Sequence, residues 1–132
     1  TEGFPAIVGP DLASRSKIEV QNMAFKTVGV LNRAGVMTAV TTDHPVSLIQ
    51  SLPLCAGLAV KSGLALEEGY KAITIYPAMI CGVADRVGSL EVGKDADIAV
   101  FTGNPMEVFT RTLYTIIDGE IAYEADKAEE AV

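Results

Sequence analysis

The sequence of 132 residues has little histidine and little cysteine, the side chains that supply nitrogen and sulfur ligands to zinc. Histidine occurs once, as His44, and the two cysteines, Cys55 and Cys81, form no Cys-x-x-Cys pair. A zinc site in a protein needs three or four nitrogen, sulfur or oxygen ligands. The composition therefore excludes a self-contained zinc site built mainly from imidazoles. Two cysteines in apolar surroundings also provide no disulfide framework, so we expect both thiols to be buried and reduced.

Positive charge and long apolar runs are also scarce. Lysine and arginine number 10 against 17 aspartates and glutamates, which gives a net charge of −7. Nucleic acids and anionic membranes attract cationic surfaces, so we expect neither of them as a partner. No apolar run reaches the ~20 residues that cross a bilayer, and no secretory signal segment opens the chain. Together with the reduced thiols, this pattern favours a cytoplasmic location.

The residues that are present have a globular balance, 49% hydrophobic and 20% charged, and they form two differently patterned parts. In the first part, residues 1–84, short apolar runs alternate with stretches of helical spacing, which is typical of parallel α/β units. Gly35 is suited to end the first of these helices. The expected strands lie at 6–8 and 36–40, and the expected helices at 24–34, 66–75 and 78–84.

The helix that precedes Gly63 has two possible starts. Ser47 fits a capping box with Gln50, but that start places Pro53 inside the helix. A start at Ser51 places Pro53 in the first turn, where proline is tolerated. The local sequence does not decide between them.

The second part, residues 85–124, is rich in glycine and in short β-like runs. Apolar runs at 97–101, 113–118 and 121–123 predict strands, and the Asp118-Gly119 pair between two of them predicts a hairpin. An acidic tail follows at 125–132.

Two strands are too few for a parallel sheet that is buried on both faces. We therefore expect residues 1–84 to be the last units of a larger barrel or sheet. The first residue, Thr1, is not a methionine, which agrees with a piece of a longer protein.

The main chemical candidate is Asp43, in the run Thr41-Thr42-Asp43-His44-Pro45 that follows the expected strand at 36–40. In α/β barrels the carboxyl ends of the strands carry the catalytic side chains. A carboxylate there can bind a metal ion and accept a proton from an attacking water. The alternative is that Asp43 only begins the turn before Pro45. For His44, a substrate contact or a proton shuttle beside Asp43 competes with a loop histidine bonded to neighbouring backbone.

A second cluster of charge, Lys94-Asp95-Ala96-Asp97, is better explained as a polar turn that enters the strand after it. The spacing of Gly88, Gly93 and Lys94 does not match a phosphate-binding loop, because the Gly-Lys-Ser/Thr ending is missing. A serine hydrolase is also disfavoured, since the chain has no Gly-x-Ser-x-Gly elbow.

The second part nevertheless resembles one family closely. The runs AITIYPA at 72–78, DRVGSLEVGKDADIAVF at 85–101 and IDGEIAY at 117–123 resemble the C-terminal signature of the amidohydrolase superfamily, in particular its imidazolonepropionase-like and prolidase-like members. Tyr76 departs from the family pattern, which usually has asparagine before Pro-Ala, so local packing should differ there.

The resemblance implies the C-terminal strands and helices of a (β/α)8 TIM-like barrel in 1–84, followed by part of a small composite β-sandwich in 85–124. Members of the family are metal-dependent hydrolases. Their ligands are a His-x-His pair on the first strand, a carboxylated lysine or glutamate on the fourth, histidines on the fifth and sixth, and an aspartate on the eighth. Only the last has a match here, Asp43, as metal ligand and general base.

The resemblance further implies hydrolysis of the C–N bond of a small-molecule amide by activated water, with a divalent metal, zinc by default. One aspartate and one histidine cannot hold a metal at useful affinity, so the chain alone should be inactive.

The expected partner of the chain is the missing N-terminal part of the same enzyme or another copy of this chain. The competing hypothesis is a non-catalytic module for self-association or binding, derived from an amidohydrolase.

Overall fold

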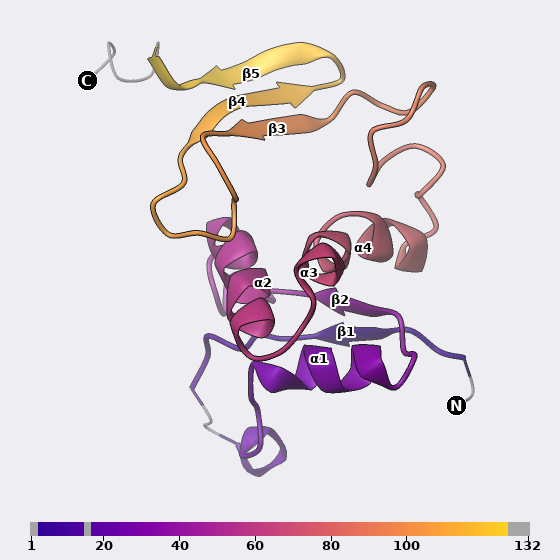
Figure 1. Cartoon of the computed structure of the whole chain (residues 1–132), viewed down its shortest axis with the longest axis vertical. Helices are drawn as coiled ribbons and strands as arrows, with labels where there is room; N and C mark the ends of the chain where they lie inside the picture. The colour runs from indigo at the N-terminus through magenta and orange to yellow at the C-terminus, as the bar shows by residue number, and fades with distance from the viewer. Residues whose placement is uncertain (1–2, 15–16, 127–132) are drawn as a thin grey trace.

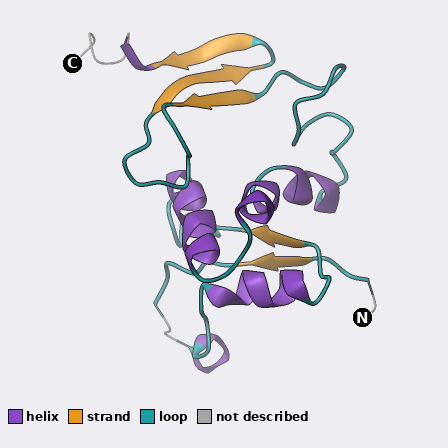
Figure 2. Ribbon diagram, in the orientation of Figure 1, coloured by secondary structure: helices purple, strands orange, loops and turns teal. Residues whose placement is uncertain are grey.

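The chain has a mixed α/β fold (Figures 1 and 2). Its strands form from short runs of β-branched residues and alanine, which are bounded by proline, glycine or polar turns. The computed structural model describes residues 3–14 and 17–126. Its elements, in order, are β1 (Ala6–Val8), η1 (Ile18–Val20), α1 (Lys26–Arg33), β2 (Thr38–Val40), η2 (Ile49–Ser51), α2 (Leu52–Lys61), α3 (Leu66–Ala72), α4 (Ile75–Ile80), β3 (Ile98–Phe101), β4 (Thr112–Ile117) and β5 (Glu120–Glu124).

The first part is one parallel βαβ unit with three further helices. β1 and β2 pair in parallel, with Val8 opposite Val40, and α1 connects them. Gly35 ends α1 as predicted: its φ is +80°, its N–H bonds to the carbonyl of Asn32, and the N–H of Val36 bonds to the carbonyl of Leu31. This is the Schellman pattern, in which a left-handed residue satisfies the last carbonyls of a helix.

The core of this part lies between β2 and the helices. Its buried members come from α1, β2, α2, the turn before α3, and α3, and Val8 of β1 packs against them. They are Val28, Val40, Cys55, Ala59, Leu64 and Ala72. On β1 itself, Ile7 is 58% exposed. An isoleucine so exposed in the middle of a strand indicates a sheet that is only partly covered.

The helices resolve one open prediction and correct another. α2 begins at Leu52 after a 3-10 turn, with Pro53 in its first turn, so the start at Ser51 is confirmed and the start at Ser47 was wrong. The break between the helices that were expected at 66–75 and 78–84 lies earlier, between Ala72 and Ile75. Pro77 instead occupies the first turn of α4, where its missing N–H costs nothing.

Cys81 also differs from its prediction. Cys55 is buried as expected, but Cys81 is exposed. α4 ends at Ile80, so Cys81 is its C-cap residue, and together with Pro77 and Ala78 it lines an open pocket between α4 and β3. The helical pattern of the sequence does not reveal that α4 ends there.

The second part contains the three expected strands, which pair as one antiparallel sheet in the order β3-β4-β5. Ile117 pairs with Glu120, which leaves Asp118 and Gly119 as a two-residue turn with φ values of +52° and +81°. Two positive φ values are what the type I′ hairpin turn requires, so the hairpin is confirmed. In Figure 1 this sheet lies at one end of the molecule and β1, β2 and α1 lie at the other, with α2, α3 and α4 between them.

A glycine-lined contact joins the sheet to the helices. The loop between β3 and β4 places the buried Met106 against α2 and α3. A Cβ at Gly57 would lie 2.8 Å from the Met106 carbonyl oxygen, and one at Gly69 would lie 3.1 Å from the Met106 Cε. The Tyr70 hydroxyl donates to Asn104 Oδ1 at 2.9 Å. The domain boundary after residue 84 stays a prediction, and most of the expected tail, 127–132, lies outside the described residues.

Tyr76, the departure from the family pattern, belongs to a polar cluster around Glu68. The Tyr76 hydroxyl donates to Glu68 Oε2 at 2.7 Å, Asn32 Nδ2 donates to the same oxygen at 2.8 Å, and Lys71 Nζ donates to Oε1 at 2.8 Å. The hydrogen bonds from Lys71 and then Tyr76 lower the pKa of the Glu68 carboxyl. The cluster ties α1, α3 and α4 together.

We expect Tyr76→Phe to lower the free energy of unfolding of the complete protein by about 1 kcal/mol at pH 7, because it removes one donor to a carboxylate. The pKa of Glu68 in the folded protein lies below its value in the unfolded protein. The hydrogen bonds to its carboxylate therefore add to the free energy of unfolding at pH values above the unfolded pKa, and this addition is lost as the pH falls through the folded pKa. The cost should therefore shrink at pH 3. Urea unfolding at both pH values measures it.

Tyr123→Phe is the control, because the Tyr123 hydroxyl forms no hydrogen bond with any residue described in the structure. An equal cost for both substitutions, or a cost that does not change with pH, would contradict a role for the Glu68 cluster.

Candidate functional site

The candidate site lies where the two parallel strands end. Parallel strands place their carboxyl ends at the same edge of a sheet, and here the Thr41 N–H donates to the Val8 carbonyl at 2.9 Å just past β2. Asp43 follows at the same edge and is exposed. The structure thus places Asp43 as the sequence predicted, at the carboxyl end of a buried parallel strand, three residues past Val40.

The backbone of Asp43 is held on both sides. Its N–H donates to Thr41 Oγ1 at 3.1 Å, and its carbonyl accepts the N–H of Val46 at 2.8 Å. Its φ is +51°, a left-handed conformation that aspartate and asparagine tolerate better than most residues. The alternative prediction is therefore correct for the main chain, because Asp43 does begin a turn. Its carboxylate, however, has no hydrogen-bond or ion-pair partner among residues 3–14 and 17–126, so it remains available to a ligand.

His44 lies next to Asp43 in the same exposed turn, before Pro45. In the described part of the chain its ring forms no hydrogen bond, so the backbone-bonded alternative finds no support there. Its role as a substrate contact stays a prediction.

Metal binding needs more donors than this edge provides. The described ranges contain no group of three or more histidine, cysteine, aspartate or glutamate side chains that could hold a metal ion. A free carboxylate fits a zinc or other divalent cation as one ligand of several. Asp43 can therefore complete a metal site whose other ligands come from elsewhere, but it cannot form one by itself.

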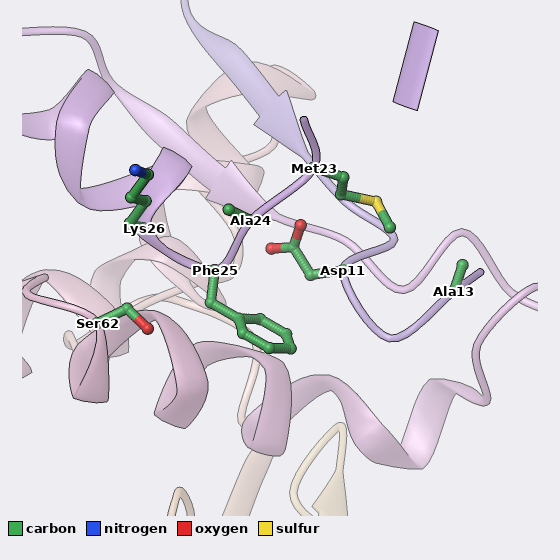
Figure 3. A pocket seen from close by; sticks show the side chains of 7 residues that line it. All are labelled: Asp11, Ala13, Met23, Ala24, Phe25, Lys26 and Ser62. Carbon is green, nitrogen blue, oxygen red and sulfur yellow. The ribbon is translucent and has the colours of Figure 1, made fainter. Parts of the chain in front are cut away.

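A small pocket beside the same edge contains an acidic side chain that the sequence analysis passed over. The pocket has a volume of about 410 Å³ and lies between the loop after β1, the start of α1 and the end of α2 (Figure 3). Asp11 is half-buried in it, and this burial raises the pKa of the Asp11 carboxyl. Burial, and secondarily the charge of Asp11, raise the pKa of Cys55. The signal that could have revealed Asp11 is its position two residues after Gly9, at the end of a strand.

The charged residues of the family signature have structural partners. Arg86 donates to Asp95 Oδ2, Lys94 Nζ lies 3.1 Å from Glu91 Oε1, and Asp97 Oδ1 accepts the N–H of Asp118 at 2.9 Å. The prediction of a polar turn is confirmed for this segment.

Comparisons with known proteins agree with the resemblance in the sequence. The model of the "Amidohydrolase family" matches residues 12–122. An amidohydrolase of Thermotoga maritima superimposes with a TM-score of 0.89 and 35% identity, over 92% of this chain and 32% of that one. An imidazolonepropionase of Syntrophobacter fumaroxidans is 43% identical over 72 residues, which is 52% of this chain and 17% of the relative.

A Xaa-Pro dipeptidase structure with bound methionine has a TM-score of 0.65 and 27% identity, and the match covers 76% of this chain and 25% of that one. The chain thus spans between 17% and 32% of the length of these relatives. No helix among the described residues combines the length and the apolar character that a membrane span requires.

Proposed function

Since the chain belongs to the amidohydrolase family, we propose that it is the C-terminal part of a metal-dependent enzyme that hydrolyses a C–N bond. The observation that carries the proposal is the carboxylate of Asp43, exposed and without a described partner at the carboxyl end of two parallel strands. In barrel enzymes this edge is where substrate and catalytic groups meet.

In this proposal Asp43 has two roles. Its carboxylate is one ligand of a divalent cation, zinc by default, and the general base of the reaction. As base it accepts a proton from the water that attacks the amide carbon, and it then delivers the proton to the leaving nitrogen. A bound divalent cation lowers the pKa of water and polarises a carbonyl group. His44, on the same turn, is placed to contact the substrate.

The substrate class that we propose is a small molecule with an amide-like C–N bond. A cyclic amide and a dipeptide-like bond both fit, in view of the imidazolonepropionase and the Xaa-Pro dipeptidase among the relatives. The loops that follow β1 and β2 at this edge, residues 15–16 aside, are where specificity would reside.

We further propose that β1 and β2 are the last two strands of an eight-stranded barrel and that β3–β5 are part of a composite β-sandwich. Supporting this, Ile7, Ile117 and Ile121 are 57–60% exposed, although each lies in a strand. A largely apolar cavity of about 810 Å³ lies between α3, α4 and β3, lined in part by Ile73, Pro77 and Phe101. The partner that covers these surfaces is the N-terminal part of the same enzyme or a second copy of the chain.

The same exposed apolar side chains favour a second candidate, a non-catalytic module that associates with itself. The size of the native product distinguishes the two candidates. A product several times 13.9 kDa on a blot, with a bound divalent cation and an activity lost on chelation and restored by zinc, is expected of the enzyme. A native product near 13.9 kDa would exclude the enzyme and leave the self-association module.

A further inference from the structure

Thr41, two residues before Asp43, forms two hydrogen bonds at the start of the turn that contains Asp43. Thr41 donates its own N–H to the Val8 carbonyl, and its Oγ1 accepts the Asp43 N–H. The Asp43 carbonyl is separately held by Val46. Among the residues that the structure describes, the Thr41 hydroxyl is thus the side-chain group whose hydrogen bond links the end of β2 to the backbone of Asp43.

Thr41 is itself held in place by the other strand. Gly9, just past the end of β1, packs so closely on Thr41 that an added Cβ would lie 2.0 Å from its carbonyl oxygen and 3.2 Å from its Cγ2. Such an approach leaves no room for a side chain on Gly9. The carbonyl group and the methyl group of Thr41 therefore both lie close to the backbone of Gly9, so Thr41 cannot shift toward the end of β1.

Asp43 has a backbone conformation that depends on such support. A non-glycine residue at φ +51° is uncommon, and it persists where surrounding contacts determine it. This backbone conformation sets the direction of the Asp43 Cα–Cβ bond, and the carboxylate extends from that bond. A hydrogen bond to the N–H of Asp43 thus acts on where the carboxylate points.

From these contacts we propose that Thr41 is a positioning residue for Asp43, and that Gly9 of the adjacent strand end holds Thr41 in the position that this requires. The inference rests on the proposed role of Asp43 as metal ligand and general base. Residues that orient a metal ligand through a hydrogen bond typically change metal affinity or activity by about 10–100-fold when they are replaced.

The test uses the complete enzyme with Thr41→Val, which keeps the shape of the side chain but removes the oxygen, and Thr41→Ser, which keeps the oxygen but removes the methyl group. We expect Thr41→Val to weaken zinc affinity and to lower kcat by about 10–100-fold, with KM nearly unchanged. Thr41→Ser should remain within about 3-fold of the wild type, because its hydroxyl still reaches the Asp43 N–H. Zinc affinity is measured by competition with a chelator.

Thr41→Ala keeps the test valid if valine at this position disturbs folding, since it also lacks the oxygen but is smaller than threonine. Equal zinc affinity and kcat in Thr41→Ala and the wild type would overturn the inference, as would a serine variant as impaired as the valine variant.

Asp43→Asn separates the positioning role of Thr41 from the proposed role of Asp43 on which it rests. If Asp43→Asn loses turnover while the variants without the Thr41 oxygen retain it, only the positioning role fails. If Asp43→Asn retains turnover, both proposals fail.

Discussion

Asp43→Asn is expected to lower kcat of the complete enzyme by about 10²–10⁴-fold while leaving the protein folded. Asparagine has nearly the same size as aspartate and also tolerates the φ of +51° found at this position, so the turn should persist. The amide cannot accept a proton from the attacking water, and it lacks the negative charge that favours a divalent cation. Turnover and bound zinc should therefore both fall. Steady-state kinetics and metal analysis measure these two effects.

The chain contains a closely matched control for this substitution. Asp118 is a second aspartate with a left-handed backbone, at φ +52°, but it lies in the β4–β5 hairpin and not at the edge where β1 and β2 end. Asp118→Asn makes the same change of charge in the same backbone conformation, and we expect wild-type turnover. Loss of turnover in both variants, or in neither, would refute the catalytic role of Asp43.

Gly9→Ala is expected to lower the free energy of unfolding of the complete protein by about 3 kcal/mol. The φ of Gly9 is +141°, and the added methyl carbon would lie 2.0 Å from a backbone oxygen. A flexible side chain could move aside at little cost, but the Thr41 carbonyl belongs to the end of β2 and cannot move without changing the strand pairing. Denaturant unfolding measures the loss, and kcat should fall as well because Thr41 precedes Asp43 by two residues.

Gly93→Ala separates the effect of backbone strain from that of the steric clash. Gly93 also has a positive φ, +95°, but a Cβ there would meet nothing within 4 Å. We expect it to cost about 1 kcal/mol, which is the typical cost of a left-handed non-glycine residue. If Gly9→Ala destabilised the protein no more than Gly93→Ala, the tight contact between Gly9 and Thr41 would not constrain the strand ends.

The features that could be predicted from the sequence depend on neighbours along the chain. Gly35 ends α1 and Asp118-Gly119 forms the hairpin turn because the conformations they adopt are local and strongly favoured by residue type. The strands around Ile7 and Ala39 are likewise bounded by local signals, proline and glycine on one side and a polar turn on the other. The position of Asp43 at a strand end follows from the same local pattern.

Tertiary contacts decided the features that the local pattern missed or left open. α3 ends at Ala72 and α4 begins at Ile75, before Pro77. The Glu68 carboxylate on α3 accepts hydrogen bonds from a side chain of α1, from one of α4 and from Lys71 of its own helix. Cys81 is exposed because no described residue fills the open pocket that it lines together with Pro77 and Ala78. Neither outcome could be predicted from periodicity, since periodicity shows which residues share a face but not what that face meets.

The sequence by itself determined the family, the alternation of strands and helices, and an aspartate at the end of a buried strand. Only the tertiary structure decided that Gly9 meets Thr41, that Thr41 holds the backbone of Asp43, and that the Asp43 carboxylate stays unpaired among the described residues. The physical reason is that a turn and a helix cap form from adjacent residues. The contact between Gly9 and Thr41 instead needs two segments, about thirty positions apart, to be brought together by strand pairing.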